Sequence, residues 1–144
     1  MLSSLLFAAA ILLSVAAQQP GPDLRVRVVA HPSIEASALT RAEVSAIFMK
    51  RVRSWPDGSE ILPVDQSPRS SAREPFSRSI HGKSVAYVTR YWQRLIFSGR
   101  GVPPPEKSSD EAVIEFVRAR PGAIGYVRPS SLPAAGVKLI EVTP

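Results

Sequence analysis

Cysteine is absent from the 144-residue sequence, and this absence excludes disulfide bonds, zinc–thiolate sites and dithiol redox chemistry. Histidine is scarce, because only His31 and His81 occur, and they are too far apart in the sequence to form a metal-spaced pair. The sequence also lacks a Gly-x-Ser-x-Gly elbow and a Walker phosphate-binding motif. We therefore expect no metal, no cofactor and no enzymatic activity.

Long blocks of like charge are also absent, although 18 basic residues against 12 acidic ones give a formal net charge of +6. Most of the basic residues are arginines that are scattered along the chain, and aromatic residues are not interleaved with them. This pattern argues against a nucleic-acid partner. Because planar guanidinium groups pair well with carboxylates and phosphates, the excess of arginine instead favours an anionic partner.

The N-terminal segment has the pattern of a secretory signal peptide. Residues 1–17 carry no charged side chain, and an apolar run over residues 5–13 is followed by small side chains at Val15 and Ala17. The run is too short for a comfortable membrane span, which favours cleavage after Ala16 or Ala17 over an uncleaved membrane anchor or a buried N-terminal helix. We expect a periplasmic protein with a signal peptide over residues 1–17, a flexible lead-in over residues 18–23 and one domain over residues 24–144.

Hydrophobic periodicity predicts that strands and helices alternate along the domain. Residues 24–30 alternate apolar and basic side chains, which is typical of a strand with one buried face. Thr40 and Glu43 form a capping box for the first helix, and Ser84 caps a longer helix that ends near Phe97. Further strands are predicted over residues 61–64, 123–127 and 137–142, and further helices over residues 73–80 and from a capping box of Ser108 and Glu111. This order predicts an α/β domain with a small mixed β-sheet flanked by helices.

The segment over residues 61–76 has the pattern of a strand, a polar loop and a helix start. Ser70 or Ser71 offers an N-cap for the helix, whose first amides would then direct partial positive charge toward the loop. Arg69 and Arg73 add fixed charge, so these two arginines and two serines together form a candidate anion-binding site. The alternative is ordinary helix capping beside two solvated arginines.

Two other residues are candidates for ligand-binding loops. His31 follows the first predicted strand, where the ligand loops of open α/β sheets gather, and Trp55 could stack on a ligand. The alternatives are a turn residue for His31 and a core residue for Trp55. A third aromatic residue, Trp92, is predicted to belong to the core, because it lies on an apolar stripe of helical spacing. That stripe consists of Val85, Val88, Trp92, Leu95 and Ile96.

An ordered set of short motifs extends over residues 24–142. The set includes Leu39-Thr40 with Ile47-Phe48, Ser54-Trp55-Pro56-Asp57-Gly58, Ile61 with Pro63-Val64, Trp92 with Phe97-Ser98-Gly99, Pro103-Pro104, and Pro121-Gly122-Ala123-Ile124-Gly125-Tyr126-Val127. In order and spacing these motifs resemble the phosphate-type periplasmic substrate-binding proteins of ABC transporters. The resemblance implies a type 2 periplasmic-binding-protein fold with phosphate or another small anion as ligand. It also implies an ABC transporter permease or another periplasmic protein as partner.

Two departures from the family pattern shape the functional hypotheses. The length matches a single lobe, so the opposite wall of the ligand cleft has no counterpart in the sequence. The Ser-Gly-Thr triplet that holds the anion in the full-size family reads Ser70-Ser71-Ala72 here, which removes the glycine that lets backbone approach a ligand closely. The first hypothesis is an exported module that binds phosphate or a related anion without catalysis. The second is a periplasmic protein-interaction module with a degenerate ligand site.

Overall fold

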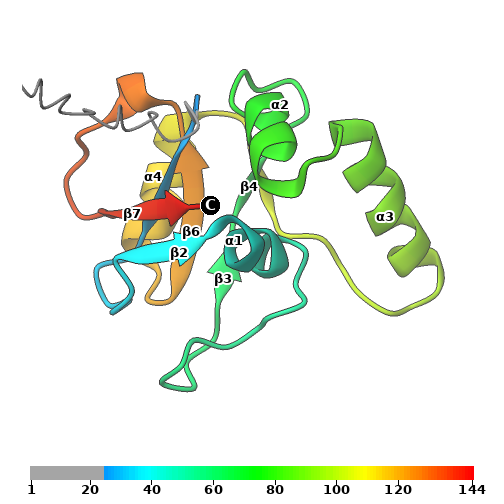
Figure 1. Cartoon of the computed structure of the whole chain (residues 1–144), viewed down its shortest axis with the longest axis horizontal. Helices are drawn as coiled ribbons and strands as arrows, with labels where there is room; N and C mark the ends of the chain where they lie inside the picture. The colour runs from blue at the N-terminus through cyan, green and yellow to red at the C-terminus, as the bar shows by residue number, and fades with distance from the viewer. Residues whose placement is uncertain (1–24) are drawn as a thin grey trace, which may run out of the picture.

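A five-stranded mixed β-sheet forms the middle of the computed structural model, which describes residues 25–144 (Figure 1). Its strands are β1 Arg27–Ala30, β2 Ala38–Thr40, β3 Leu62–Pro63, β6 Ala123–Val127 and β7 Lys138–Thr143. They lie in the order β2-β7-β1-β6-β3. Strand β1 is antiparallel to both of its neighbours, whereas β2 is parallel to β7 and β3 is parallel to β6. The predicted signal peptide and lead-in lie outside the described residues.

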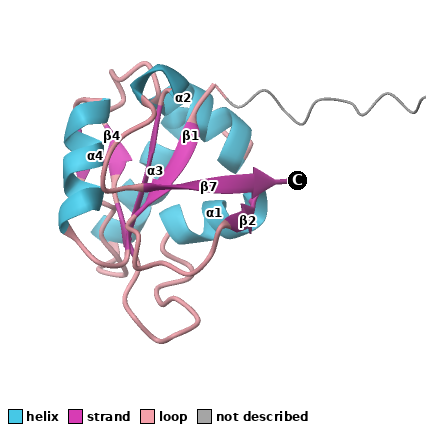
Figure 2. Cartoon of the chain, turned by 90° about the vertical axis from the view of Figure 1, so that its left-hand side faces the viewer, coloured by secondary structure: helices cyan, strands magenta, loops and turns pink. Residues whose placement is uncertain are grey.

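Helices cover both faces of this sheet (Figure 2). The α-helices among the described residues are α1 Arg41–Phe48, α2 Arg73–Phe76, α3 Val85–Phe97 and α4 Asp110–Ala119. Helix α4 covers one face, where Val113 and Val29 belong to one buried cluster. Helices α1 and α2 cover the other face, where Phe48 and Phe76 contact Tyr126 of β6. The predicted fold class, a small mixed sheet flanked by helices, is confirmed.

Side-chain caps mark where three of the helices begin. At α1 the predicted capping box is present, because Thr40 N–H donates to Glu43 Oε2 at 2.7 Å and Glu43 N–H donates to Thr40 Oγ1 at 3.1 Å. Ser84 caps α3, as the sequence predicted. At α4 the prediction was wrong by one residue, since the N-cap is Ser109 and not Ser108.

Several predicted boundaries differ from the structure. Residues 25 and 26 form a bend, so the first strand begins only at Arg27. The predicted strand over residues 61–64 is shorter, and the chain then leaves the main sheet as β4, Asp65–Gln66, which pairs in parallel with β5, Glu106–Lys107. The predicted helix over residues 73–80 begins as α2 and continues as a π-helical turn, η1 Ser77–His81. Strand β2 was not predicted.

Helix α3 stands to one side of the sheet (Figure 1). It packs inward through Val88 and Trp92, which form a small buried cluster with Met49. The predicted apolar stripe is only partly buried, because Ile96 is 49% exposed and the adjacent Phe97 is 90% exposed. The C-terminal end of α3 therefore presents apolar side chains to solvent. None of the helices within residues 25–144 has the length and apolarity needed to cross a membrane.

Candidate functional site

Polar side chains gather at the carboxyl end of β3, where the chain leaves the sheet and enters the loop over residues 67–72. Because β3 and β6 are parallel, their carboxyl ends lie at the same edge of the sheet. In open α/β sheets this edge is where ligands commonly bind. We call the group of polar residues here the carboxyl-edge site. It consists of Asp65, Gln66, the 67–72 loop, Arg73, Asp110 and Tyr126.

Arg73 begins α2, but its guanidinium group is buried and the residue is only 3% exposed. Its Nη1 lies 3.0 Å from Asp65 Oδ1 and donates a 2.6 Å hydrogen bond to Gln66 O. Glu106 Oε1 lies 3.5 Å from the same nitrogen. The positive charge of Arg73 is therefore compensated inside the protein rather than presented to the loop.

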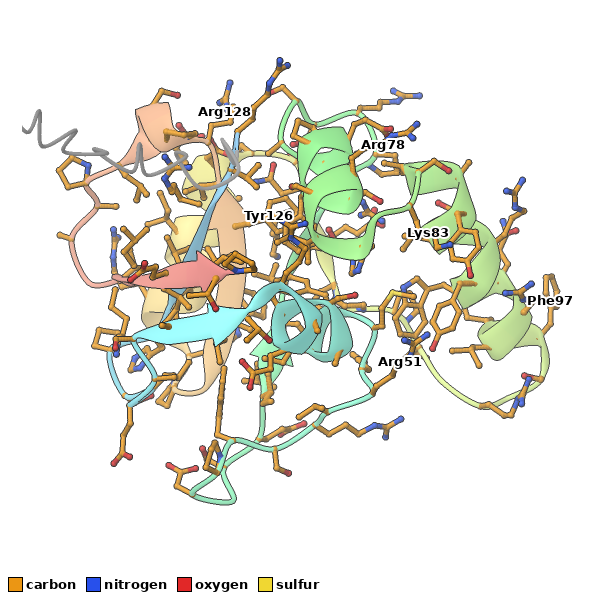
Figure 3. The ribbon with its side chains drawn as sticks, viewed as in Figure 1. Arg51, Arg78, Lys83, Phe97, Tyr126 and Arg128 are labelled. Carbon is orange, nitrogen blue, oxygen red and sulfur yellow. The ribbon has the colours of Figure 1, made fainter. Side chains whose placement is uncertain are left out.

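Asp65 is the buried partner of this ion pair, and three donors hold its carboxylate. Besides Arg73, the Tyr126 hydroxyl and the Gln66 N–H donate to Asp65 Oδ1. Burial raises the pKa of Asp65, and the positive charge of Arg73 opposes that shift. Burial and the Asp65 charge also raise the pKa of Tyr126, so its hydroxyl stays protonated and available as a donor. The Tyr126 ring lies between the sheet and α2 (Figure 3), stacked on Phe76 with 3.7 Å between centroids.

Gln66 links the loop to α4 and β6. Its Nε2 donates to Asp110 Oδ1 at 2.9 Å and to Tyr126 O at 2.8 Å, while its Oε1 accepts a hydrogen bond from the Ser70 hydroxyl. Ser70 Oγ in turn accepts from Ala72 N–H at 3.2 Å. The Ser70 side chain therefore maintains the shape of the loop.

Asp110, the first residue of α4, is a second buried carboxylate, with 1% exposure. Its Oδ2 accepts hydrogen bonds from Ser131 Oγ at 2.6 Å and from Arg128 Nε at 2.9 Å. Burial alone would raise the pKa of Asp110, but the hydrogen bonds from Ser131, Gln66 and Arg128 together hold it below its usual value. Ser131 belongs to a 3-10 turn, η2 Pro129–Ser131, so this carboxylate fastens the start of α4 to the segment after β6.

The 67–72 loop does not cap α2 in the predicted way. The N-cap residue is Ala72, which makes no side-chain capping bond, because the Ser70 hydroxyl turns back to Gln66 instead. Arg69 and Ser71 are exposed, and within residues 25–144 their side chains have no hydrogen-bond or ion-pair partner. Of the four predicted anion-binding residues, these two present polar groups to solvent, whereas Ser70 and Arg73 hold the loop in place.

His31 and Trp55 lie at the other end of the sheet. Trp55 is 7% exposed, and its Nε1–H donates to Gly122 O at 3.0 Å. The His31 N–H donates to Ala123 O at 2.9 Å. Both contacts are at the amino end of β6, so the structure does not bring these residues together with the 67–72 loop. Among the described residues, no three His, Asp or Glu side chains are grouped so that they could hold a metal ion.

The sequence interpretation missed the buried polar network of the carboxyl-edge site. It treated Asp110 as a charge at a helix start and gave no role to Asp65, Gln66 or the Tyr126 hydroxyl. One signal was available, because Asp65 and Gln66 directly follow an apolar strand and precede a turn, where polar side chains of a site commonly lie.

His81, at the end of η1, is largely buried beside this site. Its Nδ1 lies 2.8 Å from Ser45 Oγ, and its ring meets the Phe76 ring edge-on with 5.4 Å between centroids. Burial, followed by the positive charges of Arg73 and Arg51, lowers the pKa of His81 to about 4. The folded protein therefore holds a neutral imidazole at this position.

We predict that acidification destabilises the fold through His81. Its pKa is lower in the folded than in the unfolded chain, so its contribution to stability is complete above the unfolded pKa and is lost as the pH falls toward about 4. Between pH 7.5 and 5 this loss should be roughly 2 kcal/mol of unfolding free energy. Urea denaturation at both pH values measures it. In His81→Gln the fall in unfolding free energy between these two pH values should be smaller by about that amount. In the control His31→Gln it should be the same as in the unsubstituted protein. Equal pH dependence in all three proteins would contradict the prediction.

Comparison with known proteins places this geometry in a structural context. No protein-family model and no curated protein matches the sequence. The fold is similar to that of a Clostridium perfringens protein, which is described as a phosphate ABC transporter substrate-binding protein and was solved with bound phosphate. The TM-score is 0.62, and the two sequences are 16% identical over 81% of this chain and 44% of that one. It is equally similar to an ABC-type phosphate transport receptor of Vibrio cholerae, with a TM-score of 0.62 and 19% identity over 81% and 45% of the two chains.

A third similar structure is PstS of Borrelia burgdorferi, with a TM-score of 0.58 and 14% identity over 83% of this chain and 47% of that one. The chain thus spans less than half the length of the solved proteins that it matches. The resemblance read from the motifs is confirmed at the level of the fold, which is that of a single lobe of a periplasmic-binding-protein-like structure.

Proposed function

We propose that this protein is an exported, single-lobe solute-binding module that binds phosphate or a related small anion without catalysis. The proteins that share its fold are described as phosphate-binding components of ABC transporters, which supports a phosphate-type ligand. A membrane-embedded permease of such a transporter would then be its partner. The observation that carries the proposal is a pair of exposed donors, Arg69 and Ser71, in the loop at the carboxyl end of β3, whose side chains have no partner among residues 25–144.

The four residues of the proposed anion site have two different roles. Arg69 supplies a guanidinium fork and Ser71 a hydroxyl donor, and these groups contact the anion directly. Ser70 fixes the loop through Gln66, and Arg73 fixes the start of α2 through its buried contact with Asp65. Because the described residues supply a single wall, an anion bound to them alone stays partly hydrated and the site is screened by salt. We therefore expect a dissociation constant in the millimolar range, corresponding to about 4 kcal/mol.

Calorimetric titration with sodium phosphate tests this proposal. We expect saturable binding at low ionic strength that weakens at high salt, with about tenfold weaker binding in Arg69→Ala and a smaller loss in Ser71→Ala. Arg90→Ala is a matched control, because Arg90 is also an exposed arginine but lies on α3. An absence of saturable heat from the folded protein, or an equal loss in Arg90→Ala, would reject the site.

The alternative function, a periplasmic protein-interaction module, also has a specific observation in its favour. Most polar groups of the carboxyl-edge site are already satisfied by one another, including the guanidinium group of Arg73 and the Ser70 hydroxyl. A site of this kind can serve to stabilise the fold rather than to bind a ligand. A folded protein that binds neither phosphate nor sulfate would favour this second function.

A further inference from the structure

A groove of about 570 Å³ separates α3 from the segment that joins α1 to β3. Its walls come from the segment between α1 and β3, the β3 strand, the inner side of α3, the connection that follows α3 and, at Phe116, helix α4. None of its lining residues belongs to the 67–72 loop, so it is distinct from the proposed anion site. The apolar part of the lining includes Val52, Tyr91, Trp92, Leu95, Val102 and Phe116.

Positive charge dominates the polar part of the groove. Four basic residues contribute to the lining, and Glu60 is the one acidic residue among the lining residues. The basic residues are Lys50, Arg51, Arg53 and Arg100. Partial burial, and to a smaller extent the nearby charge of Arg53, lower the pKa of Lys50, while Glu60 opposes this shift. The sequence contains no acidic residue between Glu74 and Glu106, so the α3 side of the groove adds no negative charge.

The groove also exposes aliphatic side chains. Val52 and Val102 line it and are 45% and 65% exposed, and Leu95, which also lines it, is partly buried against the cluster of Met49, Val88 and Trp92. Arg51 lies between the body of the domain and α3 (Figure 3), with its guanidinium carbon 5.7 Å from the centre of the Tyr91 ring. Apolar side chains and cations thus share one concave surface, and its shape suits an extended chain better than a flat membrane.

Backbone pairing at the open edge of β3 is blocked. Pro63 has no N–H group, and the flanking donors are occupied, because Ile61 N–H bonds to Arg53 O at 2.9 Å and Asp65 N–H bonds to Pro105 O at 2.9 Å. A segment bound here would therefore be recognised through its side chains rather than as an added strand.

We propose that this groove binds an acidic peptide segment of another protein, in which aliphatic or aromatic anchor side chains alternate with carboxylates. The carboxylates pair with Arg51, Arg53 and Arg100, while the anchors cover Val52 and Val102. Interface cores of this kind combine apolar anchors with arginine contacts. The proposal does not depend on anion binding at the 67–72 loop.

Selection from a displayed library of random ten-residue peptides against the immobilised protein of residues 18–144 provides the test. We expect the enriched peptides to combine Asp or Glu with Leu, Ile, Phe or Trp, and to bind with micromolar affinity that falls as salt is raised. Binding of a fluorescent enriched peptide should weaken at least tenfold in Arg51→Glu/Arg53→Glu and severalfold in Val52→Ser/Val102→Ser. The control Arg25→Glu/Arg78→Glu makes the same change in net charge at a shallow hollow elsewhere on the surface and should bind normally.

Three outcomes would overturn the proposal. The first is an enrichment of basic or uncharged peptides, and the second is equal weakening in the control variant. The third is an absence of any enriched peptide combined with strong binding to phosphatidylglycerol vesicles that is lost in Phe97→Ser. Phe97 projects from the end of α3 (Figure 3), so the third result would mark this face as a membrane contact instead.

Discussion

Replacing Arg73 with Ala should lower the free energy of unfolding by about 3–5 kcal/mol, because the substitution leaves Asp65 buried without its cation. It also removes the 2.6 Å hydrogen bond to Gln66 O. Urea denaturation followed by circular dichroism measures the loss. Because Arg73 stabilises the fold, loss of anion binding in this variant would not by itself identify Arg73 as a ligand-binding residue.

Arg78→Ala provides a matched control for Arg73→Ala. Arg78 is an ion-paired arginine five residues later in the same helical segment, but its side chain is 65% exposed and that of its partner, Glu74, is 51% exposed. Its removal should cost less than about 1 kcal/mol. Adding Asp65→Asn to Arg73→Ala should recover part of the lost stability, since a neutral amide needs no compensating charge. Equal losses in the two arginine variants would show that the Arg73 pair is not energetically important.

Replacing Gly122 with Ala should cost at least about 3 kcal/mol of unfolding free energy. Gly122 has a φ of 85°, and a Cβ atom there would lie 2.3 Å from Glu60 O, which is backbone and cannot rotate away. The Gly122 carbonyl accepts hydrogen bonds from the Trp55 indole and from Leu62 N–H. A backbone shift that relieves the contact with Glu60 would also disturb these two bonds. Chemical denaturation of purified protein measures the effect.

Gly58→Ala separates the steric part of this cost from the backbone strain. Gly58 has nearly the same φ, 87°, but a Cβ atom there would have no atom within 4 Å. Its substitution should therefore cost only about 1 kcal/mol, the strain of a left-handed alanine. Similar losses at the two glycines would mean that the contact with Glu60 relaxes at little cost.

The predictable part of this fold is the part encoded by near neighbours in the sequence. The capping box of Thr40 and Glu43 and the cap at Ser84 depend on residues within one helical turn, and both are present in the structure. The cap of α4 was misplaced because Ser108 and Ser109 are equally good caps locally. The choice between them is made by Asp110, whose carboxylate is held by groups on distant segments.

The unpredictable part consists of contacts between segments that are distant in the chain. Strand β2 forms only because β7 lies beside it, and its own three residues carry no clear strand pattern. The ion pair of Arg73 and Asp65 was also not predictable from near neighbours, because each charge alone is typical of a solvated position. The sequence therefore indicated that polar residues follow the strand β3, but not which of their charges are compensated by one another.

The position of β1 in the sheet has a consequence for how the chain folds. Val28 of β1 pairs with Tyr126 on one side and with Ile140 on the other, so the central strand receives both neighbours from the far end of the chain. Helices such as α1 and α3 can begin to form from local contacts, but the sheet cannot assemble until β6 and β7 have emerged from the ribosome. Contacts of such long sequence separation slow folding. A chain of this topology should therefore remain accessible to chaperones until β6 and β7 have been synthesised.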